Sequence, residues 1–162
     1  MTTLKPEQLT AIIDTREQEP YDLAPMGAAS GTLPTGDYSV QGLEDVLSLE
    51  RKSLSDFVSC CGPGRERFTA ELLRMRAYRY RAVVIEAHWS EIAAGSYRSK
   101  IAPASVMSSI AAWAGRYNVP FMLCGDRAAG EDFTKRFLLC AARNEYQRLA
   151  PLAQAISASR SA

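Results

Sequence analysis

The chain has 162 residues, of which 47% are hydrophobic and 23% charged, and its formal net charge is +1. This composition is typical of a folded globular protein and excludes fibrous, low-complexity and strongly polybasic classes. No apolar run has the length of a membrane span and the N-terminus lacks a signal-peptide pattern, so we expect one cytoplasmic domain over residues 1–162, with its core at about 10–147 and a polar tail at about 157–162.

The first part of the chain is expected to form strands joined by loops. Apolar residues 11–13 predict a short strand that ends at a charged turn, residues 14–17. Residues 18–36 are rich in Pro, Gly, Ala, Ser and Thr, which predicts a loop. Two further strands are expected over residues 37–41 and 46–50, the second continuing to about residue 52.

The rest of the chain alternates between helical and strand-like patterns. Helices are expected from Ser53 to the Gly-Pro-Gly break at 62–64, over 65–79, briefly within 87–102, from Pro103, over 131–147 and from Pro151. Short apolar runs predict buried strands over 82–86 and 119–123. This alternation predicts an α/β fold in which helices cover both faces of a sheet.

The segment 37–50 can be tested as an antiparallel hairpin around a four-residue loop, 42–45. In that register one face is wholly apolar, carrying Tyr38, Val40, Leu47 and Leu49. The other face carries Ser39 opposite Ser48 and Asp37 opposite Glu50, and Lys52 follows on the same face. A shift of one residue would place polar groups on the apolar face, so the pattern favours this register.

Opposed carboxylates on neighbouring strands repel unless a cation lies between them. Asp37 and Glu50 offer hard oxygen ligands that suit Mg²⁺ or Mn²⁺, and such an ion can activate a water against a phosphodiester. Lys52 could stabilise the charge that develops on the phosphate. The spacing is that of the PD-(D/E)xK nucleases. The alternative is a surface hairpin with a Glu–Lys pair and a Gly36–Asp37 turn.

Six arginines lie between positions 65 and 81, offset by only two glutamates. An arginine-rich element is a candidate phosphate-contact face, and the alternative is a solvated helix surface. The candidate DNA contacts are Arg65, Arg67 and Arg74.

Several motifs in order resemble the XPF family of structure-specific endonucleases. Residues 36–37 (GD) and 50–56 (ERKSLSD) match its GD…ERKxxxD signature. Residues 12–17 (IIDTRE) are similar to its first strand and D-x-R-E turn. Residues 64–65 (GR) and 83–86 (VVIE) are similar to the start of its next helix and to the strand that follows.

The resemblance covers about residues 10–125 and implies a restriction-endonuclease-like fold with a central mixed sheet. It implies an Mg²⁺- or Mn²⁺-dependent DNA endonuclease that cuts branched, flap or junction DNA in repair or recombination, and a nucleoid-associated location. The family's helix-hairpin-helix module is not matched. Pairing is expected with a second copy or a related subunit, with residues 106–113 and 133–142 as candidate interface helices unless they simply cover the sheet.

The resemblance also implies roles for individual residues. The implied metal site consists of Asp37, Glu50, Glu17, the main-chain carbonyl of Arg51, and Asp14 in support. Lys52 would be the catalytic lysine, Asp56 would orient the basic pair, and Arg65 would contact a phosphate or brace the site.

Purely structural roles remain open for several of these residues. Asp56 also fits a capping box with Ser53. Asp14 and Glu17 could be ordinary turn residues, and Arg51 alternates to the face opposite Glu50 and could serve the fold through a salt bridge. Two functional alternatives also stand: a less selective nuclease of the phage or restriction type, and a non-catalytic DNA-binding or scaffolding subunit.

Overall fold

A six-stranded mixed sheet runs through the centre of the computed structural model, which describes residues 4–159. Its strands are β1 (Thr10–Asp14), β2 (Gly27–Gly31), β3 (Tyr38–Val40), β4 (Leu47–Ser53), β5 (Tyr80–Glu86) and β6 (Phe121–Leu123), in the order β2-β1-β3-β4-β5-β6. β3 is antiparallel to both β1 and β4, whereas the β1–β2, β4–β5 and β5–β6 pairs are parallel.

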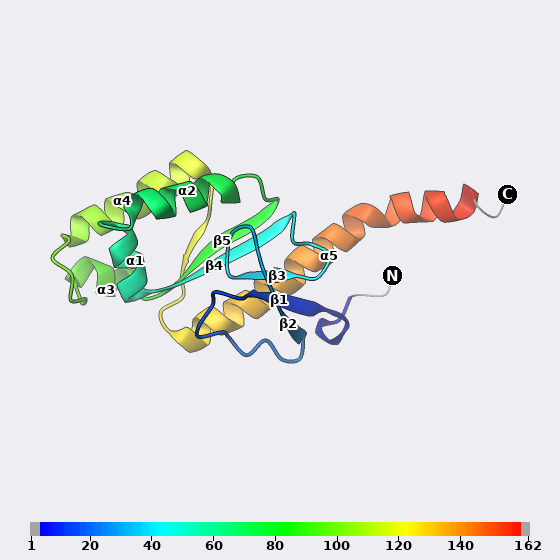
Figure 1. Cartoon of the computed structure of the whole chain (residues 1–162), viewed down its shortest axis with the longest axis horizontal. Helices are drawn as coiled ribbons and strands as arrows, with labels where there is room; N and C mark the ends of the chain where they lie inside the picture. Colours follow the sequence, from blue (N-terminus) through cyan, green and yellow to red (C-terminus); the bar gives the residue numbers. More distant parts are fainter. Residues whose placement is uncertain (1–3, 160–162) are drawn as a thin grey trace.

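Helices lie on both faces of this sheet, as the sequence predicted (Figure 1). One face packs against α1 (Leu54–Cys60), α2 (Arg65–Met75), α3 (Trp89–Ala94) and α4 (Pro103–Tyr117), and a short 3-10 turn, Pro6–Gln8, precedes β1. The aromatic side chains of Phe57, Phe68 and Trp113 contact one another edge to face in this layer. The other face packs against α5 (Arg127–Ser159), with Leu138 and Ala141 over Leu47 and Leu49.

The sequence missed β2, which lies inside the segment expected to be a loop. Its sequence is GAASG, and four of its five residues are exposed. Small residues carry little strand propensity and bury nothing at this edge, so the strand exists because its backbone pairs in parallel with β1. Gly31 also allows close approach, since a β-carbon there would crowd the Ile12 side chain.

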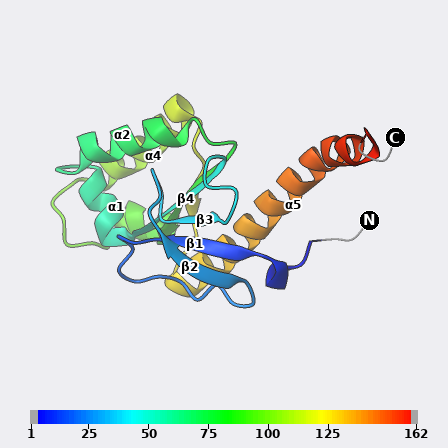
Figure 2. The ribbon, with the colours of Figure 1, turned by 45° about the vertical axis from the view of Figure 1, so that its right-hand side comes forward.

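The C-terminal helix differs most from expectation. One continuous helix, α5, replaces the predicted helix 131–147, the second piece and the start of the polar tail; residues 160–162 of that tail lie outside the described residues. It contains Pro151, which the helix tolerates in a segment that projects beyond the sheet (Figure 2). Elsewhere only bounds differ: α2 ends at Met75 instead of 79, and β5 begins at Tyr80.

The apolar faces proposed as interface helices are used by the core. In α4, Val106, Ile110 and Trp113 are all buried, so this face covers the sheet, which was the alternative interpretation. The large apolar side chains that α5 leaves exposed lie instead on its second half: Tyr146, Leu149, Leu152 and Ile156. Within residues 4–159, no helix combines the length and apolar character that a membrane crossing needs.

Candidate active site

The hairpin register is confirmed at its centre, where Tyr38 pairs with Leu49. The N–H of Asp37 donates to the Leu49 carbonyl at 2.8 Å, which places Asp37 beside Glu50 as predicted. Gly36 makes this approach possible. It has φ +79°, and a β-carbon there would collide with Ser48 Oγ and crowd the Leu49 carbonyl. The backbone therefore requires glycine at position 36, and the chemistry requires the carboxylate of Asp37.

The polar face of the hairpin is also inside the protein. Ser39, Ser48 and Glu50 are all buried, because α1 and α2 cover this side of β4. Burial raises the pKa of Asp37 to about 6. The hydrogen bond from the Arg51 N–H and the charge of Lys52 act in the opposite direction and lower this pKa, but their effect is smaller. Burial, and then the charge of Asp37, raises the pKa of Glu50 well above its ordinary value. The fold thus forces two carboxyl groups together in a site with little water.

Lys52 is the cation at this carboxylate pair. Its ammonium group contacts Glu50 Oε1 and lies 5.6 Å from the centre of the Phe68 ring. Burial alone would lower the pKa of Lys52, but the charge and hydrogen bond of Glu50 raise it above its ordinary value. Lys52 therefore stays charged at neutral pH.

A polar hollow of about 520 Å³ opens above the pair. Acidic, basic and hydroxyl side chains line it, among them Arg16, Glu17, Asp37, Lys52, Ser53, Asp56 and Arg67. Glu50 lies beneath it, in contact with Lys52. Asp37 and Lys52 thus face space that a substrate phosphate can enter, with Arg16 and Arg67 lining the same hollow.

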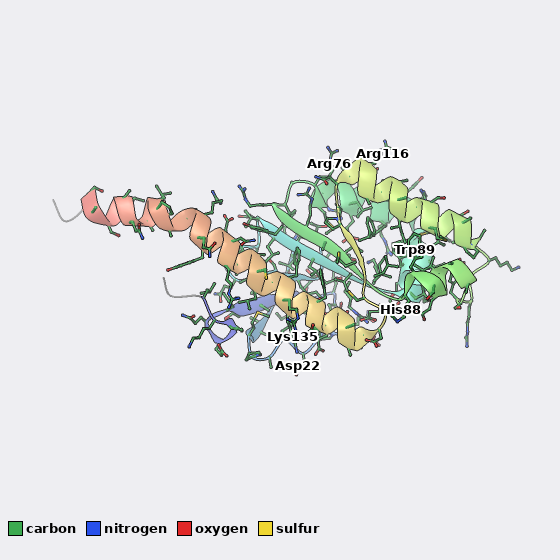
Figure 3. All side chains as sticks on the ribbon, turned by 180° about the vertical axis from the view of Figure 1, so that it is seen from behind. Asp22, Arg76, His88, Trp89, Arg116 and Lys135 are labelled. Carbon is green, nitrogen blue, oxygen red and sulfur yellow. The ribbon has the colours of Figure 1, made fainter. Side chains whose placement is uncertain are left out.

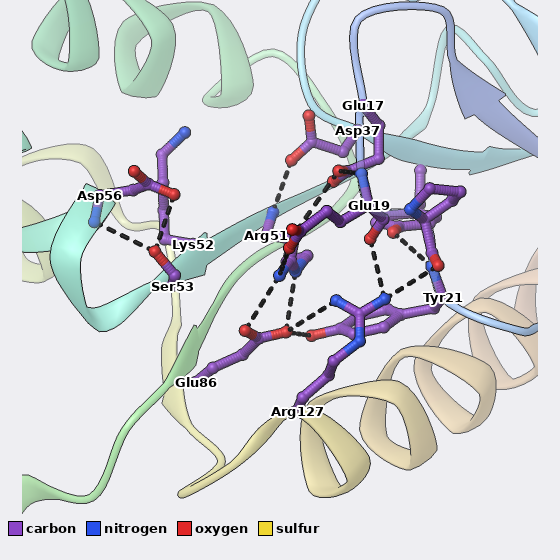
Figure 4. A network of polar contacts seen from close by, with 12 residues as sticks. Glu17, Glu19, Tyr21, Asp37, Arg51, Lys52, Ser53, Asp56, Glu86 and Arg127 are labelled. Atoms are coloured by element: carbon purple, nitrogen blue, oxygen red, sulfur yellow. Dashed lines mark hydrogen bonds and ion pairs between the residues drawn. The ribbon is translucent and has the colours of Figure 1, made fainter.

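Arg51 points to the opposite face of β4, as its alternation in the strand predicted. Its guanidinium forms two hydrogen bonds with Glu86, at 2.8 and 3.0 Å, and its Nη1 lies 3.4 Å from Glu17 Oε1 (Figure 4). Its backbone N–H donates to Asp37 Oδ2 at 2.8 Å. Arg51 therefore links the hollow to the α5 side of the sheet, and its salt bridges serve the fold.

Asp14 is directed away from the hollow. Its carboxylate accepts hydrogen bonds from Arg16 Nε (2.6 Å), Arg16 Nη2 (3.1 Å) and the N–H groups of Arg16 and Leu33. Burial alone would raise the pKa of Asp14, but these bonds lower it. The Asp14 carboxylate does not join those of Asp37 and Glu50, but the Asp14 N–H donates to the Asp37 carbonyl at 2.8 Å and the Asp14 carbonyl accepts the Glu17 N–H at 3.0 Å, so Asp14 supports the backbone of the site.

Asp56 caps α1. Ser53 Oγ accepts the Asp56 N–H at 3.2 Å and donates to Asp56 Oδ2 at 2.7 Å, so the pair reproduces part of a capping box. Asp56 lines the hollow, but the hydrogen bonds of its carboxylate run to Ser53 and none runs to Arg51 or Lys52.

The three candidate DNA-contacting arginines lie in different places. Arg67 lines the hollow. Arg65 braces α2 against α4: it donates to Ser109 Oγ at 2.8 Å and lies 4.7 Å from the centre of the Trp113 ring. Arg74 is exposed in the last turn of α2.

His88 lies outside this site, and of the four cysteines only Cys60 lines the hollow. His88 precedes α3, where its N–H donates to Glu91 at 2.6 Å; Figure 3 shows it next to Trp89. All four cysteines are free: Cys60 and Cys61 are buried, Cys124 is half-buried and Cys140 is exposed.

Sequence reasoning missed the partners of Arg51. Glu86 ends β5, and β5 runs parallel to β4 with Ser53 opposite Glu86. The available signal was an acidic residue at the end of an apolar strand, but its use required the strand order. Tyr21 and Arg127, which also contact Glu86, come from a loop and from the start of α5.

The donor set fits a small divalent cation. Within residues 4–159 no three His, Cys, Asp or Glu side chains are already gathered as a ligand cluster. Mg²⁺, however, needs only one or two protein carboxylates, with water and substrate phosphate completing its shell. Asp37 and Glu50 are two carboxyl groups whose mutual repulsion a cation would relieve.

Comparisons with known proteins agree with this geometry. A sequence profile of the ERCC4 domain matches residues 13–137. The structure is similar to XPF from Aeropyrum pernix, with a TM-score of 0.64 and 20% identity over 90% of this chain and 69% of that one. The same archaeal protein in complex with DNA gives a TM-score of 0.65 and 22% identity over 85% of this chain and 66% of that one. No curated protein matches the sequence.

Proposed function

The chain belongs to the ERCC4-domain family, whose nucleases are DNA endonucleases, and from that premise we propose that it hydrolyses DNA with Mg²⁺ or Mn²⁺ at branches, flaps or junctions. The observation that carries the proposal is the pairing of the half-buried Asp37, which lines the hollow, with the buried Glu50, and the contact of Lys52 with Glu50. An ordinary surface hairpin has no reason to hold two acids side by side with one of them buried, since their repulsion destabilises the fold.

Different residues would bind the cation and stabilise the phosphate charge, as phosphodiester hydrolysis requires. Asp37 and Glu50 would hold the cation, which when bound polarises the phosphate and lowers the pKa of an attacking water. Glu17 would complete the ligand set from the loop. The ammonium group of Lys52 would face the phosphate oxygens and stabilise the charge that develops on them. Water adds to phosphorus and one P–O bond to a sugar breaks.

The hollow supports DNA as the substrate class. Arg16 and Arg67 line it together with Asp37, which suits contacts to phosphates near the scissile bond. The structure resembles a protein that has been solved in complex with DNA, and the chain spans about two thirds of that protein's length. A preference for branched DNA and pairing with a second copy or a related subunit are part of the same proposal.

Cleavage of labelled flap, fork and linear duplex DNA with Mn²⁺, with Mg²⁺ and with chelator tests the proposal. We expect cutting with either metal, none with chelator, and loss of cutting in Asp37→Asn while DNA binding persists. Asp132→Asn is the matched control, because it removes a carboxylate from an exposed ion pair with Arg136.

The outcomes separate the alternatives. Equal cutting of linear and branched DNA would favour the less selective nuclease. DNA binding without cutting, by folded protein in both metals, would favour the scaffolding subunit and refute the enzyme. Unchanged cutting by Asp37→Asn would remove Asp37 from the site.

A further inference from the structure

A second polar network lies on the face of β4 opposite the carboxyl pair (Figure 4). Its centre is Glu86, whose two oxygens accept from Arg51 Nε and Nη2. Tyr21 donates its hydroxyl to Glu86 Oε1 at 2.7 Å, and Arg127 Nη1 lies 3.7 Å from the same oxygen. The side chains of Arg51 and Glu86 are each only 9% exposed. Charge-assisted bonds in such a place are strong and directional.

The network is held from several sides. Arg127 donates to the carbonyls of Glu19 and Pro20, both at 2.9 Å, which fixes the loop before Tyr21 to the start of α5. Gly130 lets α5 approach, since a β-carbon there would collide with the Tyr21 hydroxyl. The Tyr21 and Arg51 positions are therefore fixed by packing as well as by hydrogen bonds.

Glu17 is held by Arg51 less closely than Glu86 is. The Glu17 side chain is only 7% exposed, yet its contact with Arg51 is 3.4 Å, longer than either bond from Arg51 to Glu86. Its Oε1 also accepts the N–H of Glu19 at 2.8 Å, a bond within the same loop. Glu19 also approaches Arg51, at 3.5 Å, but it is 76% exposed and contributes little. Arg51 thus has its charge balanced by Glu86, whether or not Glu17 remains beside it.

Glu17 is also a candidate for a further ligand. It lines the same hollow as Asp37, and its charge acts on Asp37. Arg51 donates a hydrogen bond to each carboxylate, to Glu17 from the guanidinium and to Asp37 from the backbone N–H.

We propose that Glu86, with Tyr21, is a positioning residue that occupies the Arg51 guanidinium and so leaves Glu17 free to turn toward Asp37 and bind the cation. The inference rests on the proposed function. Without Glu86, Arg51 pairs with Glu17 as its remaining buried acid, and Glu17 is withdrawn from the metal site. Glu86 touches neither the cation nor the DNA; it acts through Arg51.

Mn²⁺ binding to the whole chain without DNA, measured by calorimetry, tests this. We expect Glu86→Gln to weaken Mn²⁺ binding about tenfold, as loss of an outer partner of a metal ligand does. Glu86→Gln also removes a negative charge, which would weaken cation binding through space. The same substitution is therefore made in a Glu17→Gln background, where a positioning effect disappears and a through-space effect persists.

Each outcome decides something. A tenfold loss that vanishes with Glu17→Gln supports the proposal; an equal loss in both backgrounds, or no loss, overturns it while leaving the nuclease intact. A wild-type protein that binds no Mn²⁺ overturns the metal-dependent function itself. Tyr21→Phe removes one hydrogen bond without changing charge. If Glu86→Gln fails to fold, Tyr21→Phe replaces it: we expect a smaller loss of Mn²⁺ affinity that again disappears in the Glu17→Gln background. Thermal melts of each variant and the Asp132→Asn variant serve as controls.

Discussion

Asp37→Asn should stabilise the metal-free protein at neutral pH while abolishing cleavage. Burial raises the pKa of Asp37 from its ordinary 3.8 to about 6. The folded state therefore binds this proton more tightly than the unfolded state does. Stability from Asp37 is present in full below about pH 4 and is lost as the pH rises through 6. At pH 7.5 the loss is about 3 kcal/mol, because each unit is worth about 1.4 kcal/mol.

Asparagine resembles the protonated acid and keeps an oxygen for the Arg51 N–H. Without metal, at pH 7.5, we expect the Tm to rise by about 5–10 °C, since about 1 kcal/mol moves a domain of this size by about 2–4 °C. The gain should fall to roughly half at pH 5, where wild-type Asp37 is largely protonated in the folded state.

Calorimetry at pH 5 and 7.5 with chelator measures this difference, and Asp132→Asn, from an exposed pair, should show no such gain. Added Mn²⁺ should raise the Tm of the wild type and not that of Asp37→Asn. An Asp37→Asn protein no more stable than the wild type at pH 7.5 would refute the reasoning, because the carboxyl group would then carry no burial penalty.

Three further results are expected. Lys52→Met should lower single-turnover cleavage in Mn²⁺ by about 10²-fold or more, because the charge facing the phosphate is lost; a near-normal rate would contradict the role of Lys52. The wild-type rate should rise about tenfold per pH unit up to about pH 6 and then level off, as Asp37 ionises to hold the cation, whereas a flat profile would contradict this. Ser53→Ala should lower the Tm by about 2–4 °C through loss of the α1 cap, worth about 1 kcal/mol; an unchanged Tm would contradict the capping role of Ser53.

The hairpin was predictable because its side chains repeat with period two. Tyr38 and Leu49 could share a face only in one register, and that register placed Asp37 beside Glu50. The cap at Ser53 was predictable for a similar reason, since a serine before an apolar helical run is a local signal. Local patterns thus located both sides of the hollow.

The remaining features depend on contacts between distant segments. β2 has no apolar alternation and is a strand only because β1 offers it a partner. The length of α5 was underestimated because Pro151 predicts a break, but the helix continues beyond the sheet. Glu86 gains its role from the parallel pairing of β5 with β4, which no local pattern in either strand reveals.

The sequence Glu50-Arg51-Lys52 joins two layers that a strand keeps apart. Because side chains alternate, Glu50 and Lys52 enter the α1–α2 layer while Arg51 enters the α5 layer. Arg51 can still act on the site, since its backbone N–H holds Asp37 on the first face while its guanidinium holds Glu86 on the second. A change at Glu86 can therefore reach the carboxyl pair without any contact with it.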